Sequence, residues 1–160
     1  MNDKDIVEVL LVEDNPRDAE LTIRALKRHN LANQLFHVED GAEALDFLFG
    51  RGKYEGRRID PSPKVVLLDL KLPKVNGLEV LQSMKSDPRL RTIPVVMVTS
   101  SAEDPDIKAA YNLGANGYVI KPVQFDSFME AMSKVGIYWL MVNHPMKSNR
   151  DMHTRRHWAI

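Results

Sequence analysis

Short apolar runs bounded by acidic or turn residues recur along the chain. They cover Ile6 to Val12, Gln34 to Val38, Val65 to Leu68, Val95 to Val98 and Gly117 to Ile120. Their short length and their content of β-branched residues predict β-strands. The runs around residues 9, 67 and 97 are almost wholly apolar, as expected of strands that helices cover on both faces. The pattern therefore predicts a parallel sheet.

Between and after these runs, apolar residues recur at spacings of three and four, which places each set on one face of a helix. The sets are Ala19, Ile23 and Leu26; Ala42, Ala44, Leu45 and Leu48; Leu78, Leu81 and Met84; Ile107, Ala110 and Leu113; and Phe125, Phe128, Met129, Met132, Val135 and Trp139. Pro16 and Pro105 suit the first turn of a helix. Asn30, Gly50 and Gly114 are of the types that end helices. Strands and helices therefore alternate along the chain.

Such alternation predicts an open, doubly wound α/β fold. Right-handed crossovers between parallel strands leave few topologies, and the flavodoxin-like strand order 2-1-3-4-5 is a common one. We expect a flavodoxin-like (βα)5 domain over residues 1–143. Two segments fall outside the scheme: a loop rich in Gly, Pro and Arg at 50–64, and a basic tail at 144–160.

Composition narrows the classes of function. Lys plus Arg equals Asp plus Glu at 22 each, so no net charge attracts nucleic acid or an anionic membrane. The absence of cysteine excludes thiolate metal ligands and thiol nucleophiles. The N-terminus MNDKD does not have the layout of a signal peptide, and no apolar run approaches the roughly 18 to 20 residues of a membrane span. We expect a soluble, cytoplasmic protein.

Polar residues that could bind a ligand or take part in a reaction follow the predicted strands. They lie at the edge where open α/β sheets place their functional groups. They are Glu13, Asp14, Asp69, Thr99, Ser100 and Lys121. Three carboxylates at one edge repel one another unless a hard cation lies among them, and Mg2+ takes oxygen ligands from carboxylates, water and phosphate. The sequence therefore predicts a Mg2+ site, which Mn2+ could also fill.

Asp69 is the best candidate for a nucleophile, because its strand should be central in the sheet. A carboxylate beside a metal ion can attack phosphorus while a lysine neutralises the transferred oxygens. Each residue also has an ordinary structural alternative. An acidic pair such as Glu13 and Asp14 often complements a helix dipole, and an Asp after a strand often caps a turn. The convergence of these groups on one edge favours the chemical interpretation.

Four segments together resemble the receiver domains of two-component response regulators. They are VEDN at 12–15, LLDLKLPKVNG at 67–77, VTSS at 98–101 and YVIKP at 118–122. The resemblance extends over about residues 6–143. It implies a phosphoprotein of a two-component system that receives its phosphoryl group from the phosphohistidine of a sensor histidine kinase. It also implies that the chain is not an enzyme acting on an external substrate.

The resemblance implies a role for each matching position. Asp69 would be the phosphoacceptor, Lys121 the ion-pair partner of the phosphoryl group and Thr99 the hydroxyl that binds it. Tyr118 would be the aromatic switch residue that turns inward when Thr99 moves. The bond between Lys121 and Pro122 would be a candidate cis peptide, the isomer that X-Pro bonds most readily adopt.

The same resemblance assigns the metal ligands. Glu13 and Asp14 would bind the ion together with Asp69 and the backbone carbonyl of Lys71. Glu13 stands where many receivers have Asp, which favours a water-bridged contact from this residue.

The end of the last predicted helix suggests a partner. Residues Val135 to Val142 are apolar nearly all round, and such a helix is usually covered on more than one side. A second copy of the chain, giving a homodimer, is one interpretation, and cover by the chain's own tail is the other. The 50–64 loop, residues 72–101 and the long last helix resemble regulators paired with bacterial phytochrome kinases, which implies light signalling.

The sequence also indicates how the chain would pass on its signal and which other functions are possible. No helix-turn-helix motif follows residue 143, so we expect output through protein contacts of the last two helices and the strand between them. Three alternatives remain open: a phosphorelay shuttle, a receiver that binds partners without phosphorylation, and a haloacid-dehalogenase-like Mg2+ phosphatase. The phosphatase needs a second acid two residues after its nucleophile, where Lys71 stands.

Overall fold

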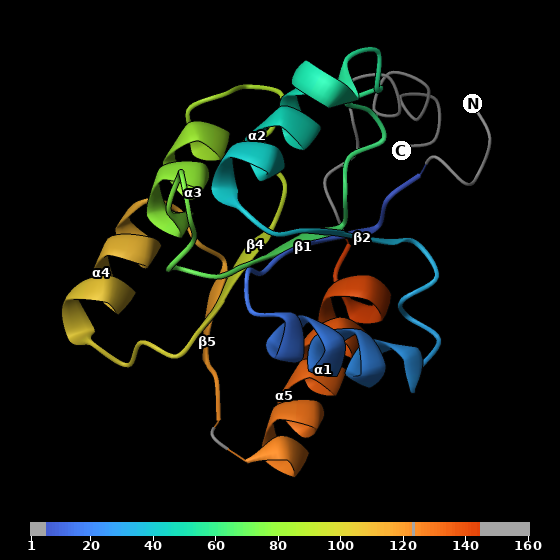
Figure 1. Cartoon of the computed structure of the whole chain (residues 1–160), viewed down its shortest axis with the longest axis vertical. Coiled ribbons are helices and arrows are strands. Elements are labelled where there is room, and N and C mark those ends of the chain that lie inside the picture. The colour runs from blue at the N-terminus through green and yellow to red at the C-terminus, as the bar shows by residue number, and fades with distance from the viewer. Residues whose placement is uncertain (1–5, 123, 145–160) are drawn as a thin grey trace, which may run out of the picture.

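The computed structural model describes residues 6–122 and 124–144. In this part of the chain, five parallel strands form one sheet in the order β2-β1-β3-β4-β5, which confirms the predicted topology (Figure 1). The strands are β1 (Val9–Val12), β2 (Leu35–Val38), β3 (Val65–Leu68), β4 (Val95–Thr99) and β5 (Gly117–Ile120). The first strand begins three residues later than the apolar run that predicted it.

Helices cover both faces of this sheet. They are α1 (Pro16–Lys27), α2 (Gly41–Phe49), α3 (Gly77–Lys85), α4 (Asp104–Asn112) and α5 (Phe125–Ile137). Figure 1 shows α1 and α5 on one face and α2, α3 and α4 on the other. A 3-10 turn, η2 (Gly52–Tyr54), follows α2, and a π-helical segment, η3 (Tyr138–Val142), continues α5. No helix in the described ranges is both long enough and apolar enough to cross a membrane.

The central strands are buried on both sides, as their continuous apolarity predicts. In β1, Leu10 and Val12 join the core beneath α2, α3 and α4, whereas Val9 and Leu11 join the core beneath α1 and α5. Alternate residues of a strand point to opposite faces of a sheet, so a strand between two helical layers needs apolar residues throughout. This packing sets the carboxyl ends of β1, β3 and β4 side by side.

Local signals set the helix boundaries near the site. The Asn15 side chain accepts hydrogen bonds from the backbone N–H groups of Arg17 and Asp18, and Pro16 occupies the first turn of α1. Asp40 caps α2 in the same way through the N–H of Glu43. Gly50 ends α2 in the left-handed conformation, with φ of 64°, which a residue without Cβ adopts at little cost.

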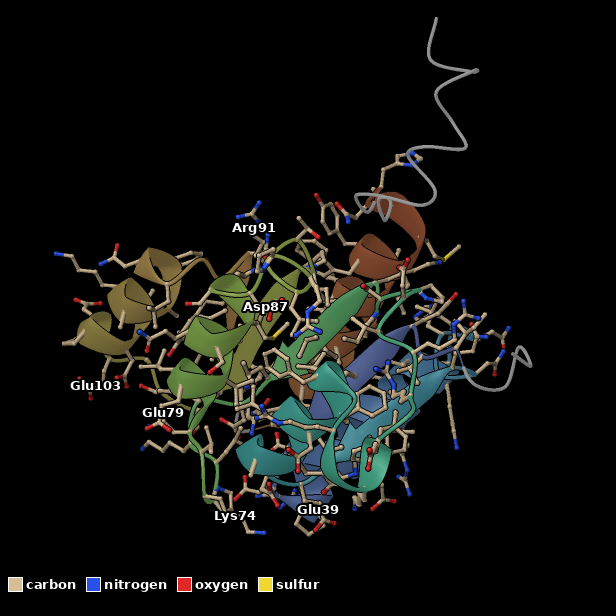
Figure 2. All side chains as sticks on the ribbon, turned by 90° about the horizontal axis from the view of Figure 1, so that it is seen from above. Glu39, Lys74, Glu79, Asp87, Arg91 and Glu103 are labelled. Carbon is tan, nitrogen blue, oxygen red and sulfur yellow. The ribbon has the colours of Figure 1, made fainter. Side chains whose placement is uncertain are left out.

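The loops at the two ends of the strands lie far apart. Figure 2 shows Glu39 and Lys74 at one edge of the molecule and Arg91 at the opposite edge. Lys74 Nζ lies 3.5 Å from a carboxylate oxygen of Asp40, so the loop after β2 contacts the loop after β3. Both loops are at the carboxyl edge of the sheet, where the predicted site residues lie.

The predicted loop at 50–64 is more ordered than its composition indicates. The Tyr54 ring packs edge-on against Phe36 and Phe47, and the Arg57 guanidinium lies 3.7 Å from the centre of the Phe47 ring. Aromatic and cation–π contacts therefore hold η2 on the outside of α2.

Two further expectations concern peptide geometry and the tail. The prediction of a cis bond between Lys121 and Pro122 is wrong: within the described ranges the cis peptide bond is the one between Asp60 and Pro61. The two isomers of an X-Pro bond differ by only about 0.5–1 kcal/mol, so surrounding structure selects between them. Of the predicted tail, residues 145–160 lie outside the described residues.

Candidate functional site

The three predicted acids lie together at the ends of two neighbouring strands. Val12 and Leu68 are paired in the register of β1 and β3, so the residues that follow them, Glu13 and Asp69, emerge side by side. Carboxylate oxygens of Glu13, Asp14 and Asp69 all lie within 4.8 Å of one another. Glu13 and Asp69 are buried and Asp14 is exposed, so a cation could reach the site from solvent. This set of hard oxygen donors fits a divalent cation.

Lys121 joins this cluster from the end of β5. Its Nζ lies 2.6 Å from Glu13 Oε1 and 2.9 Å from Asp69 Oδ2. A third carboxylate, that of Asp18 in α1, lies 3.0 Å from the same nitrogen. The Lys121 side chain is only 9% exposed, so water competes little with these ion pairs. One ammonium group thus faces three carboxylates.

Burial and neighbouring charges shift the pKa values of both Glu13 and Lys121. Burial raises the pKa of Glu13 to about 8; the hydrogen bond from Lys121 opposes this effect and the neighbouring Asp69 carboxylate adds to it. Burial would lower the pKa of Lys121, but its hydrogen bonds to Glu13 and Asp69 outweigh burial and raise it. Glu13 therefore holds its proton more tightly than usual chiefly because it is buried, and Lys121 does so because two carboxylates accept its N–H groups.

Thr99 and Tyr118 share Ser101 as a hydrogen-bonding neighbour. Thr99 is the last residue of β4 and is fully buried, and its Oγ1 accepts a hydrogen bond from the N–H of Ser101 at 3.4 Å. The Tyr118 hydroxyl donates to the carbonyl oxygen of Ser101 at 2.8 Å. The Ser101 hydroxyl lies 2.5 Å from Asp106 Oδ2 in α4 and donates to it. Ser101 therefore links the two predicted switch residues to α4.

Lys71 lies at the mouth of the site. Its backbone N–H donates to Asp69 Oδ1 at 3.4 Å, and the residue is exposed. The loop that carries it is held at its end, where the N–H of Gly77 donates to the carbonyl oxygen of Leu70 at 2.8 Å. A Cβ on Gly77 would lie 2.1 Å from the backbone oxygen of Asp69, so the loop passes too close for a side chain there.

Sequence reasoning missed two residues that contact this cluster. Asp18 stands in the first turn of α1. An acid there is common because it complements the helix dipole, and nothing in the sequence distinguishes this role from a contact with Lys121. His37 in β2 places Nε2 2.8 Å from the backbone oxygen of Glu13. A backbone partner leaves no mark in the sequence.

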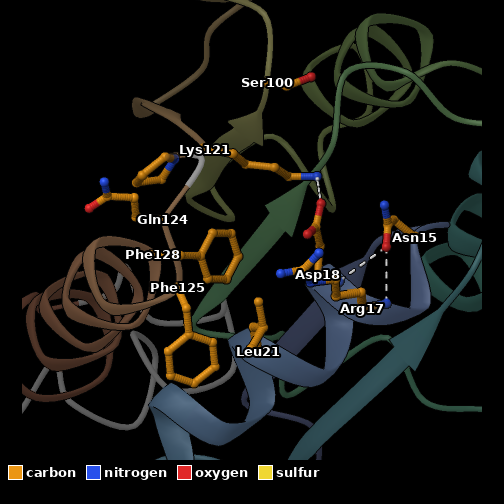
Figure 3. Close-up of a pocket in the computed structure, with 10 residues that line it drawn as sticks. Asn15, Arg17, Asp18, Leu21, Ser100, Lys121, Gln124, Phe125 and Phe128 are labelled. Atoms are coloured by element: carbon orange, nitrogen blue, oxygen red, sulfur yellow. Dashed lines mark hydrogen bonds and ion pairs between the residues drawn. The ribbon is translucent and has the colours of Figure 1, made fainter.

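A pocket of about 260 Å³ opens beside Lys121. Figure 3 shows Asp18 and Leu21 of α1 on one side of it, and Phe125 and Phe128 of α5 on another. The polar end of the pocket lies at the Lys121–Asp18 ion pair. A group entering there would meet the charged cluster directly.

Comparisons with characterised proteins agree with this architecture. The probable methanogenesis regulatory protein FilR2 of Methanothrix harundinacea is 42% identical over 132 residues, which are 82% of this chain and 83% of that protein. The response regulator Rcp1 of Synechocystis sp. is 37% identical over 132 residues, 82% of this chain and 88% of its own length.

Solved structures give the same result. The Mn(2+)-bound form of Rcp1 superposes with a TM-score of 0.80 at 36% identity and covers 86% of this chain and 97% of that one. The bacteriophytochrome response regulator AtBRR is 51% identical, with a TM-score of 0.67 and coverage of 87% of this chain and 99% of that one. A family model for the response regulator receiver domain matches residues 9–133. The chain therefore belongs to the response regulator receiver domain family, whose members are signalling proteins.

Proposed function

We propose that this receiver domain accepts a phosphoryl group on Asp69. The observation that carries the proposal is the buried Asp69 carboxylate, paired with Lys121 at 2.9 Å and accompanied by Glu13 and Asp14. A carboxylate held this way faces a positive charge that can stabilise an incoming phosphoryl group.

In the proposed reaction, a carboxylate oxygen of Asp69 attacks the phosphorus of a phosphohistidine on a sensor histidine kinase. The new O–P bond forms as the P–N bond breaks, and the imidazole nitrogen keeps the electron pair of that bond. An N–H of Lys121 then donates to a phosphoryl oxygen in place of the carboxylate it binds here. Mg2+, held by Glu13, Asp14, Asp69 and the carbonyl oxygen of Lys71, would neutralise charge on the transferred oxygens.

The side chains around Ser101 could pass the effect of phosphorylation on to a partner-binding surface. If the Thr99 side chain moved to bind a phosphoryl oxygen, it would lose the hydrogen bond that it accepts from the N–H of Ser101. Ser101 is also the residue that hydrogen-bonds Tyr118 and Asp106 of α4. The surface that would change is formed by α4, β5 and α5. It exposes large apolar side chains, with Tyr111 50% and Ile120 45% exposed. Such side chains suit a protein partner, which supports signalling through protein contacts.

The partners are part of the same proposal. AtBRR is a bacteriophytochrome response regulator, and this likeness supports a bacterial phytochrome as the kinase. An ATP-dependent kinase of this type works in the cytoplasm, so the proposal places the chain there. Within η3, Tyr138, Met141 and Val142 are 49%, 69% and 57% exposed, which supports a homodimer formed through the end of the last helix.

Turnover of an external substrate is not part of the proposal. A haloacid-dehalogenase-like phosphatase would require a carboxylate at position 71 to protonate its leaving group, and the residue there is Lys71. A phosphorelay shuttle would use the same Asp69 chemistry and differ only in passing the group to a second histidine.

The test of the phosphoacceptor is intact mass after incubation with acetyl phosphate and Mg2+. The wild type should gain the mass of one phosphoryl group, and Asp69→Asn should gain none. Asp126→Asn, at an exposed aspartate of α5, is the matched control and should label like the wild type. An unlabelled wild type, or equal labelling of Asp69→Asn, would refute the proposal.

The homodimer is tested separately, by light-scattering mass in Mg2+ with and without beryllofluoride. A dimer in either condition that Met141→Ser converts to a monomer would support the last helix as its interface. A monomer in both conditions would refute the dimer and leave the phosphoacceptor unaffected.

A further inference from the structure

The three carboxylates around Lys121 match its hydrogen-bonding capacity. A lysine ammonium has three N–H donors and no acceptor. Glu13, Asp69 and Asp18 lie 2.6, 2.9 and 3.0 Å from Nζ, so each carboxylate can take one donor. Figure 3 shows the Asp18 carboxylate directed at the Lys121 ammonium. The orientation of the ammonium group is therefore set by three residues on three different segments.

These acceptors differ in what else they do. Glu13 is buried, and its second carboxylate oxygen accepts the N–H of Asn15 at 3.2 Å. Asp69 is the residue that the proposed reaction phosphorylates. Asp18 stands outside the set of acids that could hold a metal ion. Its side chain is 23% exposed, and its backbone N–H is fixed by the Asn15 side chain at 3.2 Å.

We infer that Asp18 is a positioning residue for Lys121 in phosphoryl transfer, an inference that rests on the function proposed above. With Glu13 and Asp18 taking two N–H groups, the third is directed at Asp69, where the phosphoryl oxygens will lie. Without Asp18, one N–H group of the ammonium loses its acceptor and the group is free to turn. Small losses of alignment between reacting groups cause large losses of rate.

The charge of Asp18, taken alone, would affect the rate of phosphorylation in the opposite direction from its positioning of Lys121. Asp18 adds a negative charge beside a site that must receive an anionic phosphoryl donor, so simple repulsion predicts faster phosphorylation when that charge is removed. Positioning predicts slower phosphorylation when the acceptor is removed. It also predicts recovery when a neutral acceptor replaces the carboxylate. Asp18→Ala and Asp18→Asn therefore separate the two mechanisms.

The experiment measures the rate of phosphorylation by acetyl phosphate, a donor that needs no docking surface, together with Mg2+ affinity by titration calorimetry. Asp18→Ala should lower the maximal rate constant about tenfold, the loss expected for one hydrogen bond between charged groups. Asp18→Asn should stay within about threefold of the wild type because its amide oxygen still accepts an N–H. Mg2+ affinity should change less than about twofold in both variants.

Control experiments distinguish the role inferred for Asp18 from the proposed phosphorylation of Asp69. Glu20→Gln changes an exposed acid of the same helix, paired with Arg24, and should have no effect on the rate. If Asp18→Ala is unfolded at the assay temperature, Asp18→Ser, which is too short to reach Lys121, gives the same comparison. Equal or faster labelling of Asp18→Ala, or equally slow labelling of the Ala and Asn variants, would overturn the inference. A wild type that accepts no phosphoryl group would instead refute the proposed function.

Discussion

The Tyr118 hydroxyl donates a hydrogen bond of 2.8 Å to the carbonyl oxygen of Ser101. Ser101 is buried, and its own hydroxyl donates to Asp106 in the first turns of α4. One phenol hydroxyl therefore ties β5 to the segment that joins β4 and α4. The packing of the proposed output surface depends on this bond.

Tyr118→Phe removes the hydroxyl and keeps the ring. We expect the free energy of unfolding to fall by about 1 kcal/mol, the usual net contribution of one hydrogen bond, as measured by urea denaturation. Tyr111→Phe is the control, because Tyr111 is 50% exposed and its loss of a hydroxyl should change little. Equal stability of the wild type and Tyr118→Phe would contradict this role.

Lys121→Met leaves the buried Glu13 and Asp69 carboxylates without their cation. In EDTA the variant should lose about 3 kcal/mol of unfolding free energy, because removing one partner of a buried ion pair leaves uncompensated charge. Adding Mg2+ should stabilise this variant more than the wild type, since a cation then replaces the lost charge. Lys134→Met, at a lysine that is 76% exposed, should lose less than about 0.5 kcal/mol. Similar losses in both variants would contradict the prediction.

Gly41→Ala tests how tightly α2 holds the loop that follows Asp69. A Cβ at Gly41 would lie 1.8 Å from the backbone oxygen of Val75, so the loop must move. We expect a loss of about 1–3 kcal/mol in urea unfolding, as for other overpacked sites, and slower labelling by acetyl phosphate. Gly117→Ala is the matched control, since its Cβ would meet Val96 at an ordinary 3.6 Å. Unchanged stability and labelling of Gly41→Ala would show that the loop is not held there.

The lowered pKa of Glu43 should make the stability of the fold depend on pH. Lys53 lies 2.8 Å from its carboxylate and the Tyr54 hydroxyl donates to it; the bond from Lys53, then that from Tyr54, lowers the pKa of Glu43 below 4.5. A carboxyl group with a lowered pKa stabilises the fold at pH values above its unfolded pKa, and this contribution is lost as pH falls through the folded pKa.

Glu43→Gln should therefore be less stable than the wild type at pH 7, by under about 1 kcal/mol for so exposed a pair. The difference should shrink as the pH falls below about 4.5, the ordinary value for Glu43. Urea unfolding at a series of pH values measures it, with Glu55→Gln in the same loop as the control. A difference that stays constant down to pH 3 would show that ionisation of Glu43 is not its source.

The sequence by itself determined the architecture and most of the site. Apolar runs such as Val65–Leu68 mark strands buried on both faces, and their alternation with amphipathic helices leaves few topologies. Because parallel strands end at one edge, Glu13, Asp69 and Lys121 had to converge there once the strands were known. These features follow from residue type and periodicity, which are local properties of the chain.

Only the tertiary structure decided which side chains complete the site. Asp18 and Lys121 are 103 residues apart, and their contact depends on how α1 lies against the end of β5. The bond from His37 to the Glu13 carbonyl depends in the same way on the spacing of β1 and β2. Pairings of this kind arise from the relative placement of elements that are distant in the chain, and no pattern of neighbouring residues encodes them.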